Sequence, residues 1–189
     1  FVALFDGKTT FWEGVPEVVA LIITLTLWSV VGMLEGMQIA FFAVAKISHE
    51  ERSKSSWAAR TCDLLFDEKG YNLPGFMVGR QLCVVTCFFV AARATSMEIE
   101  DGESNVLGVS DGLQEFFNTG LLGAFITTIV ASIAWQLVAS AFPMAFLSTP
   151  ITYILLRICL LLEASGICTG AWVLAKLFKK TKGYQFDEV

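Results

Sequence analysis

The chain alternates between long apolar runs and shorter polar segments, and this pattern predicts a bundle of membrane-spanning helices. A helix that crosses the hydrocarbon core of a bilayer needs about 20 predominantly apolar residues. Four runs reach or approach that length, over residues 18–47, 76–94, 119–142 and 151–177. We therefore expect an all-α, polytopic transmembrane helix bundle with about four spans within residues 18–182. Residues 1–17 then form an N-terminal segment, and residues 183–189 form a C-terminal tail.

The polar segments between the runs differ in charge. Residues 48–72 carry both signs, and residues 57–66 have the amphipathic pattern of a helix that lies along the membrane interface. Residues 96–118 contain acidic residues and neither Lys nor Arg. Lysines cluster at the end of the last run, at Lys176, Lys179, Lys180 and Lys182. With four spans, the Lys/Arg residues of the loop over residues 48–72 and the lysines of the tail lie on opposite sides, so one of the two groups conflicts with the positive-inside rule. A re-entrant span, a partner that fixes the orientation, or a weak orientation bias would each explain this conflict.

The composition supports a membrane protein and argues against several other classes. Hydrophobic residues make up 55% of the chain and charged residues 16%, whereas charged residues average about 25% in soluble domains. The single histidine, His49, lies in a loop, so neither a histidine-based metal cluster nor a Ser/His/Asp set can form. No Gly-rich loop ends in Lys-Ser or Lys-Thr, and no basic footprint for nucleic acid is present. We expect neither an enzyme nor a nucleic-acid-binding protein.

A few polar side chains interrupt the apolar runs, and they are the candidate functional residues. An ionised side chain at membrane depth costs about 2.5–3.5 kcal/mol on insertion scales, so it persists where it is paired, faces water or has a function. In the first run, Glu35 and Gln38 are three residues apart and share a helix face, with Gly36 leaving room for a helix or a solute. The other interruptions are Gly79, Arg80 and Gln81 in the second run, Gln136 in the third and Glu163 in the fourth.

Several of these residues have a purely structural explanation as well. Glu35 and Arg80 can pair with each other and staple two helices, and Gln136 can form a hydrogen bond between helices. Arg93 and Arg157 can extend their charged ends to the interface. Glu163 has apolar or small neighbours, which favours a functional role. The sequence Asp-Gly-Leu-Gln at residues 111–114 echoes residues 35–38, but a turn and helix cap explains it better.

The two polar insertions carry a resemblance to a known family. Glu-Gly-Met-Gln at residues 35–38, followed by Gly-Arg-Gln at residues 79–81, resembles the motif pair of the silicon transporters of diatoms and of silicon-transporter-like proteins. The likeness continues through Gln136 to Glu-Ala-Ser-Gly at residues 163–166. Family members with two halves have five spans and one motif pair in each half. The resemblance therefore implies a single half that lacks its first span.

The resemblance also implies a function. The family motifs are proposed to contact orthosilicic acid during sodium-coupled uptake. Gln136 and Glu163 are expected to line the path or hold the coupling ion, and Glu163 would suit either sodium or a proton. A plasma-membrane transporter that forms homo-oligomers in the lipid bilayer would fit this reading. The residues expected to bind the substrate are Glu35, Gly36, Gln38, Gly79, Arg80 and Gln81.

The alternative is an accessory membrane subunit of a larger assembly, such as an algal photosynthetic supercomplex in the thylakoid. Glu35, Gln38 or Glu163 would then pair structurally or ligate the magnesium of a pigment, and pigments and lipids would be the bound groups. The chain lacks the paired Glu-x-x-His/Asn-x-Arg helices of ordinary light-harvesting proteins. The two hypotheses differ in whether the polar residues converge on a solute site.

Overall fold

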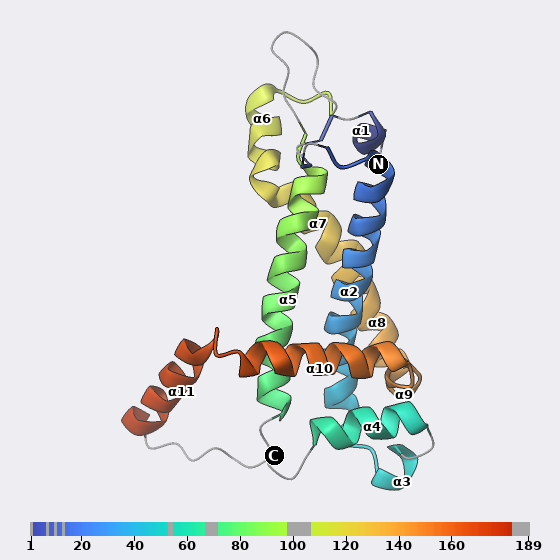
Figure 1. Cartoon of the computed structure of the whole chain (residues 1–189), viewed down its shortest axis with the longest axis vertical. Coiled ribbons are helices and arrows are strands. Elements are labelled where there is room, and N and C mark those ends of the chain that lie inside the picture. Colours follow the sequence, from blue (N-terminus) through green and yellow to red (C-terminus); the bar gives the residue numbers. More distant parts are fainter. Residues whose placement is uncertain are drawn as a thin grey trace.

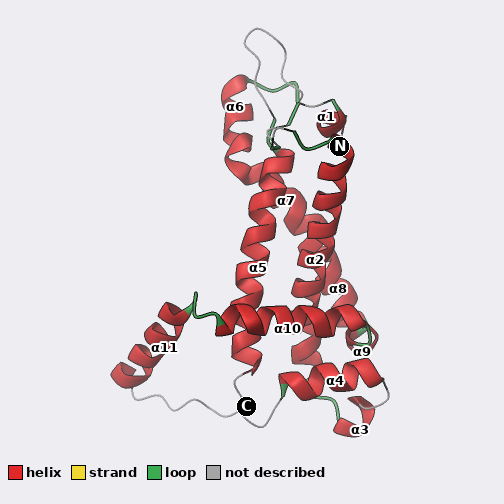
Figure 2. Ribbon diagram, in the orientation of Figure 1, coloured by secondary structure: helices red, strands yellow, loops and turns green. Residues whose placement is uncertain are grey.

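A computed structural model describes residues 2–6, 8–9, 11–12, 14–52, 55–66, 72–97 and 107–182. The described residues form helices and one isolated bridge between Thr9 and Met97, which confirms the all-α class (Figures 1 and 2). Outside the described residues lie much of the acidic segment over residues 96–118, part of the loop over residues 48–72, and the C-terminal tail. The short helix α1 (Val2–Phe5) lies beside the start of the first long helix.

Within the part of the chain that the structure describes, three helices are long and apolar enough to cross a membrane. They are α2 (Glu17–Val44), α5 (Asn72–Thr95) and a composite third helix, Asp111–Ala141. α2 starts directly after Pro16, whose ring disfavours helical backbone at the preceding residue. α2 packs against α5, and the third helix packs against both, so the three enclose a common interior (Figure 1).

The third helix is irregular. It consists of α6 (Asp111–Phe116), the π-helical segment η1 (Phe117–Leu121), α7 (Leu122–Thr127), the π-helical segment η2 (Thr128–Ile133) and α8 (Ala134–Ala141). Gly120 has a φ of 100°, a left-handed value that favours glycine, and it kinks the helix. The sequence interpretation started this span at residue 119, but the helix already starts at Asp111, whose carboxylate suits the positive end of the helix dipole.

The fourth apolar run does not form one continuous helix. It is divided into α10 (Pro150–Ala164) and α11 (Thr169–Lys182), which have 15 and 14 residues. The break contains Gly166, whose φ of 80° a helix cannot accommodate. α10 lies across the ends of α2 and α5, and α11 projects from the bundle (Figure 1). The expected continuous span over residues 151–177 is therefore corrected, while the bundle of about four apolar stretches remains.

The amphipathic segment of the loop over residues 48–72 forms the helix α4 (Ser56–Leu65), as predicted. It follows the short helix α3 (His49–Arg52). Ser55 caps α4 by accepting a hydrogen bond from the backbone N–H of Ala58. α4, α9 (Pro143–Leu147) and α11 lie at the same end of the bundle (Figure 2). The loop that contains α3 and α4 and the lysine-rich helix α11 therefore lie at one end of the three long helices (Figure 2), and the conflict with the positive-inside rule does not arise if only these three cross.

Candidate functional site

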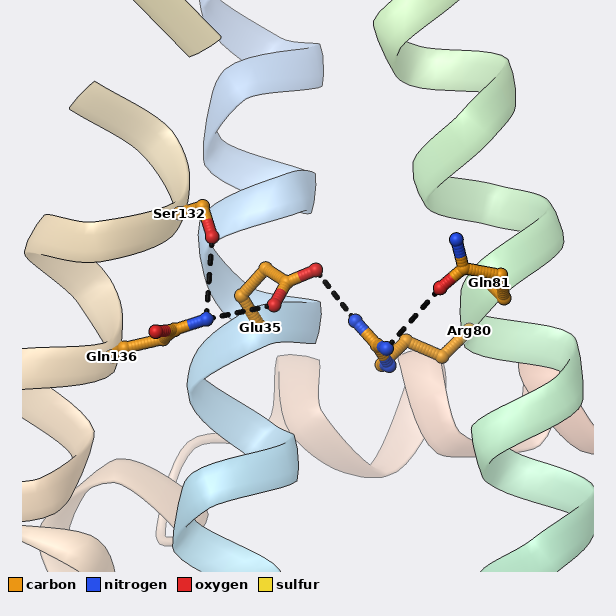
Figure 3. Close-up of polar contacts among 5 residues, drawn as sticks. All are labelled: Glu35, Arg80, Gln81, Ser132 and Gln136. Atoms are coloured by element: carbon orange, nitrogen blue, oxygen red, sulfur yellow. Dashed lines mark hydrogen bonds and ion pairs between the residues drawn. The ribbon is translucent and has the colours of Figure 1, made fainter. Parts of the chain in front are cut away.

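An ion pair connects the first two spans in the interior of the bundle (Figure 3). Arg80 on α5 donates through Nη1 to Glu35 Oε1 on α2. The Arg80 side chain is 9% exposed and that of Glu35 is 13% exposed. Because both charges are largely desolvated, removing one partner would leave an uncompensated buried charge, which is strongly destabilising.

The third span joins the pair through an amide. Gln136 on α8 donates through Nε2 to the second carboxylate oxygen of Glu35 at 2.9 Å, and it also contacts Ser132 Oγ at 3.3 Å. The two oxygens of Glu35 therefore bind two different spans, and Glu35 lies between Arg80 and Gln136 (Figure 3). A carboxylate used in this way ties all three crossing helices together.

Arg80 also has hydrogen-bonding capacity that the network leaves unused. Its Nη2 donates to Gln81 Oε1 at 3.3 Å, and Gln81 is exposed at the outer edge of the network. Its Nε is buried, and no described residue accepts a hydrogen bond from it. A buried donor without a partner costs about 1–3 kcal/mol, so this atom marks a place where an oxygen atom of a ligand would be stabilised.

Gln38 lies apart from this network. It is half-buried about one turn along α2 from Glu35, and its side chain makes no hydrogen bond within the described part of the chain. The shared helix face that the sequence predicted is present. The third span supplies Gln136 to Glu35, so the network forms without Gln38.

The two motif glycines lie against protein. A Cβ atom on Gly36 would meet the ring of Phe146 on α9 and, at 3.2 Å, the Cβ of Ala139 on α8. A Cβ on Gly79 would meet the backbone carbonyl of Cys159 on α10. Of the two neighbours that the sequence allowed, a helix or a solute, the structure places a helix beside each glycine.

Glu163 does not bind a residue of the Glu35–Arg80–Gln136 network; its hydrogen-bond partner is Trp172. It accepts a hydrogen bond from Trp172 Nε1 at 2.8 Å, across the break between α10 and α11. Its carboxylate also lies beside Gly75, where an added Cβ would be 3.5 Å from Oε2. Gly75 precedes Arg80 by little more than one turn of α5, so Glu163 lies near the network without joining it.

Two polar links between or within the spans involve residues that the apolar pattern does not single out: Ser132, and the bond between Trp28 and Thr127. Trp28 Nε1 donates to Thr127 Oγ1 at 3.0 Å and connects α2 to the third span a second time. Thr127 ends α7, and the π-helical η2 follows directly. π-helical turns frequently occur at functional sites, because they change which side chains face the interior. The four-residue spacing of Ser132 and Gln136 was the available signal.

Comparison with known proteins places the chain in a family. The family profile described as silicon transporter matches residues 1–189, which is the whole chain. Searches of curated proteins and of solved structures returned no match. The profile covers both motifs and the three spans that carry the polar network. The chain belongs to the silicon transporter family.

Proposed function

We propose that the chain carries silicic acid across its membrane and that Glu35, Arg80, Gln81 and Gln136 bind this solute. The observation that supports the site most directly is the buried guanidinium of Arg80. It is paired to a second span, yet it retains an unused Nε donor in the bundle interior. A membrane transporter needs a position in its interior where polar groups from several spans can replace hydrogen bonds to one another with hydrogen bonds to a solute.

The chemistry of the solute matches these groups. Silicic acid is a small neutral molecule near pH 7, and each of its hydroxyl groups can donate and accept a hydrogen bond. Arg80 donates, Glu35 accepts, and Gln81 and Gln136 do both. The opposite charges of Glu35 and Arg80 cancel, so a neutral solute can bind without adding net charge to the interior. One solute oxygen would accept from Arg80 Nε while a hydroxyl donates to Glu35.

Binding at this position would also change the contacts between the spans. The same carboxylate oxygens that hold Arg80 and Gln136 would accept hydrogen bonds from the solute. A solute that replaces one of these contacts weakens the link between two helices, and this couples binding to helix movement. We therefore infer that the ion pair holds the empty transporter closed at its centre.

We further propose that uptake is driven by sodium and that Glu163 is the carboxylate that senses the ion. Its place beside Gly75 puts a negative charge close to Arg80 along α5. Gln136 then acts as a lining residue, because its amide already binds Glu35. We expect two copies of the chain to associate, since it carries one motif pair. Sodium-dependent uptake and the mass of the complex in detergent test these two points separately.

A structural staple is the second explanation for the same pair, and the full use of both Glu35 oxygens favours it. The two explanations differ in their response to Arg80→Lys. A lysine keeps the positive charge beside Glu35 but lacks the Nε donor and the planar fork. If the pair only staples helices, Arg80→Lys should transport nearly as well as the unchanged protein.

The test measures silicic acid uptake into proteoliposomes with and without an inward sodium gradient. We expect Arg80→Lys to lower uptake about tenfold through the loss of one solute hydrogen bond. Lys8→Gln, which replaces an exposed lysine near the N-terminus, is the control and should leave uptake unchanged. Full uptake by Arg80→Lys would remove the site assignment. Absence of uptake by the unchanged protein, at any gradient, would contradict the transport proposal. Gln38→Ala belongs in the same series, and unchanged uptake would exclude Gln38 from the site.

A further inference from the structure

A second arrangement of arginines lies outside the polar network, where α4 packs against α10. Trp57 and Arg60 come from α4, and Tyr153 and Arg157 come from α10. Each pair is separated by three or four residues, so its two side chains share one helix face. The packing of the two helices brings the four side chains together, and we call them the arginine–aromatic ladder.

In the ladder, each aromatic ring contacts the other ring and one guanidinium group. The Arg60 guanidinium carbon lies 5.2 Å from the centre of the Trp57 ring. The rings of Trp57 and Tyr153 are 6.0 Å apart, and the Arg157 guanidinium carbon lies 5.4 Å from the Tyr153 ring. Nε and Nη2 of Arg157 also donate to the Tyr153 hydroxyl at 3.1 and 2.9 Å. Two guanidinium groups therefore flank a pair of aromatic rings, and the two arginine side chains are exposed.

The side chains around the ladder are of the kinds that are found at membrane interfaces. α10 lies across the bundle axis (Figure 1), and several of its exposed side chains are apolar. They are Ile151, Ile154, Ile158 and Leu161. A helix of this kind lies in the interface with its apolar face towards the acyl chains. Trp and Tyr are enriched at the same depth, which is the level of the lipid headgroups.

Among the described residues, the distribution of Lys and Arg side chains distinguishes this end from the other. The ladder end also carries exposed Lys46 and, on α11, exposed Lys176, with more lysines in the following turns of that helix, and it carries the exposed acidic residues Glu50, Glu51 and Asp63 as well. The opposite end, where α1 and α6 lie (Figure 1), carries the exposed acidic residues Asp6, Glu17, Asp111 and Glu115. Lys/Arg-rich ends face the cytoplasm, and the cytoplasmic leaflet is the one that contains anionic lipids.

We propose that Arg60 and Arg157 each bind the phosphate headgroup of an anionic phospholipid in the cytoplasmic leaflet. Guanidinium groups bind phosphate oxygens through paired, charge-assisted hydrogen bonds. Stacking on Trp57 and Tyr153 orients both groups before the lipid arrives, which lowers the entropy lost on binding. The isoleucine face of α10 then contacts the acyl chains of the bound lipid. This site does not depend on which solute the bundle carries.

The test measures lipid binding by native mass spectrometry, with the full chain in a neutral detergent and short-chain phosphatidylserine or phosphatidylcholine added. The unchanged protein should prefer phosphatidylserine. Arg60→Gln and Arg157→Gln should each weaken phosphatidylserine binding about fivefold, while phosphatidylcholine binding stays the same. Lys8→Gln, at the opposite end, should bind phosphatidylserine as the unchanged protein does. Circular dichroism in phosphatidylcholine nanodiscs verifies that each variant is folded.

Three results would overturn the proposal. The first is unchanged phosphatidylserine binding by the Arg60→Gln/Arg157→Gln double variant. The second is an equal loss in Lys8→Gln, which would indicate attraction by net charge alone. The third is competition by inorganic phosphate at the concentration at which the lipid binds, because the ligand would then be a free anion. Arg60→Lys and Arg157→Lys separate the effect of charge from that of the planar guanidinium group. Each should lose only part of its phosphatidylserine binding, because the positive charge remains.

Discussion

Arg80 and the two arginines of the ladder place the same guanidinium group in opposite surroundings. Arg80 lies within the bundle, 9% exposed, and its charge is balanced by Glu35. Arg60 and Arg157 lie at the surface, and each is held against an aromatic ring. In the interior, a partner charge is required because desolvation is costly. At the interface, water solvates the charge and the ring only orients it.

The difference decides what each site can do. Arg80 can bind a ligand only by using a spare donor or by giving up a bond within the protein, so its ligand must be small and matched to the network. Arg60 and Arg157 can bind a large charged headgroup without breaking anything. Substitutions should therefore affect stability and transport at Arg80, and lipid preference alone at the ladder.

Arg80→Ala should have the largest effect. It leaves Glu35 in the interior without its counter-charge, and we expect a loss of about 3–5 kcal/mol in unfolding free energy together with loss of uptake. Reversible unfolding in mixed micelles measures the first and proteoliposome uptake the second. The double variant Glu35→Gln/Arg80→Met is the matched comparison, because it removes both charges. It should recover much of the stability but not the uptake; recovery of uptake as well would mean that the pair is only a staple.

The close approach of α5 and α10, the helices that carry Arg80 and Arg157, should give the next largest effect. Gly79→Ala would place a Cβ against the backbone carbonyl of Cys159, which cannot rotate away. Overpacking of this kind costs about 1–3 kcal/mol, measured as unfolding free energy in the same micelles. Gly112→Ala on α6 is the control, because nothing lies within 4 Å of the added Cβ there. Equal effects of the two substitutions would show that backbone flexibility, not helix contact, sets the result.

Much of the fold was predictable from the apolar pattern, because burial in lipid demands long uninterrupted helices. α2, α5 and the amphipathic helix α4 lie where the pattern placed them along the chain, within a few residues. The break at Gly166 was not predicted, since a hydropathy pattern does not report a left-handed backbone conformation. The early start at Asp111 was missed for a related reason: an acidic first turn lowers local hydropathy while it stabilises the helix end.

The candidate site was predictable only in part. Glu35 and Arg80 could be identified because an ionised side chain inside a membrane is energetically costly. Their pairing with each other was one of the predicted explanations. The choice of Gln136 over Gln38 depends on how α8 packs against α2, which no local pattern encodes. The arginine–aromatic ladder was equally hidden, because it joins two helices far apart in the sequence. Arg157 alone reads as a residue that reaches the interface, and only the packing of α4 adds the second ring and the second charge.

Gln136→Leu should have a smaller effect on stability than either substitution above. It removes the hydrogen bond between the third span and Glu35 but leaves the ion pair. Hydrogen bonds between membrane helices contribute about 0.6 kcal/mol on average, so the unfolding free energy should fall by roughly that amount. Uptake should fall more, because the solute loses one of its partners. Ser140→Ala is the control, since that exposed hydroxyl donates only to a backbone carbonyl of its own helix. A loss of stability as large as that of Arg80→Ala would place Gln136, not Arg80, at the centre of the network.

The double variant Arg60→Gln/Arg157→Gln should have the smallest effect on folding. Both side chains are exposed, and substitutions at exposed positions usually change stability by no more than about 0.5 kcal/mol. In phosphatidylcholine, its unfolding free energy and its uptake should therefore equal those of the unchanged protein. Added phosphatidylserine should stabilise the unchanged protein but not the double variant, because a ligand that binds only the folded state raises its stability. If the double variant already unfolds more easily in phosphatidylcholine, the ladder serves to hold α4 against α10, and the contrast between a paired interior arginine and two ligand-binding surface arginines fails.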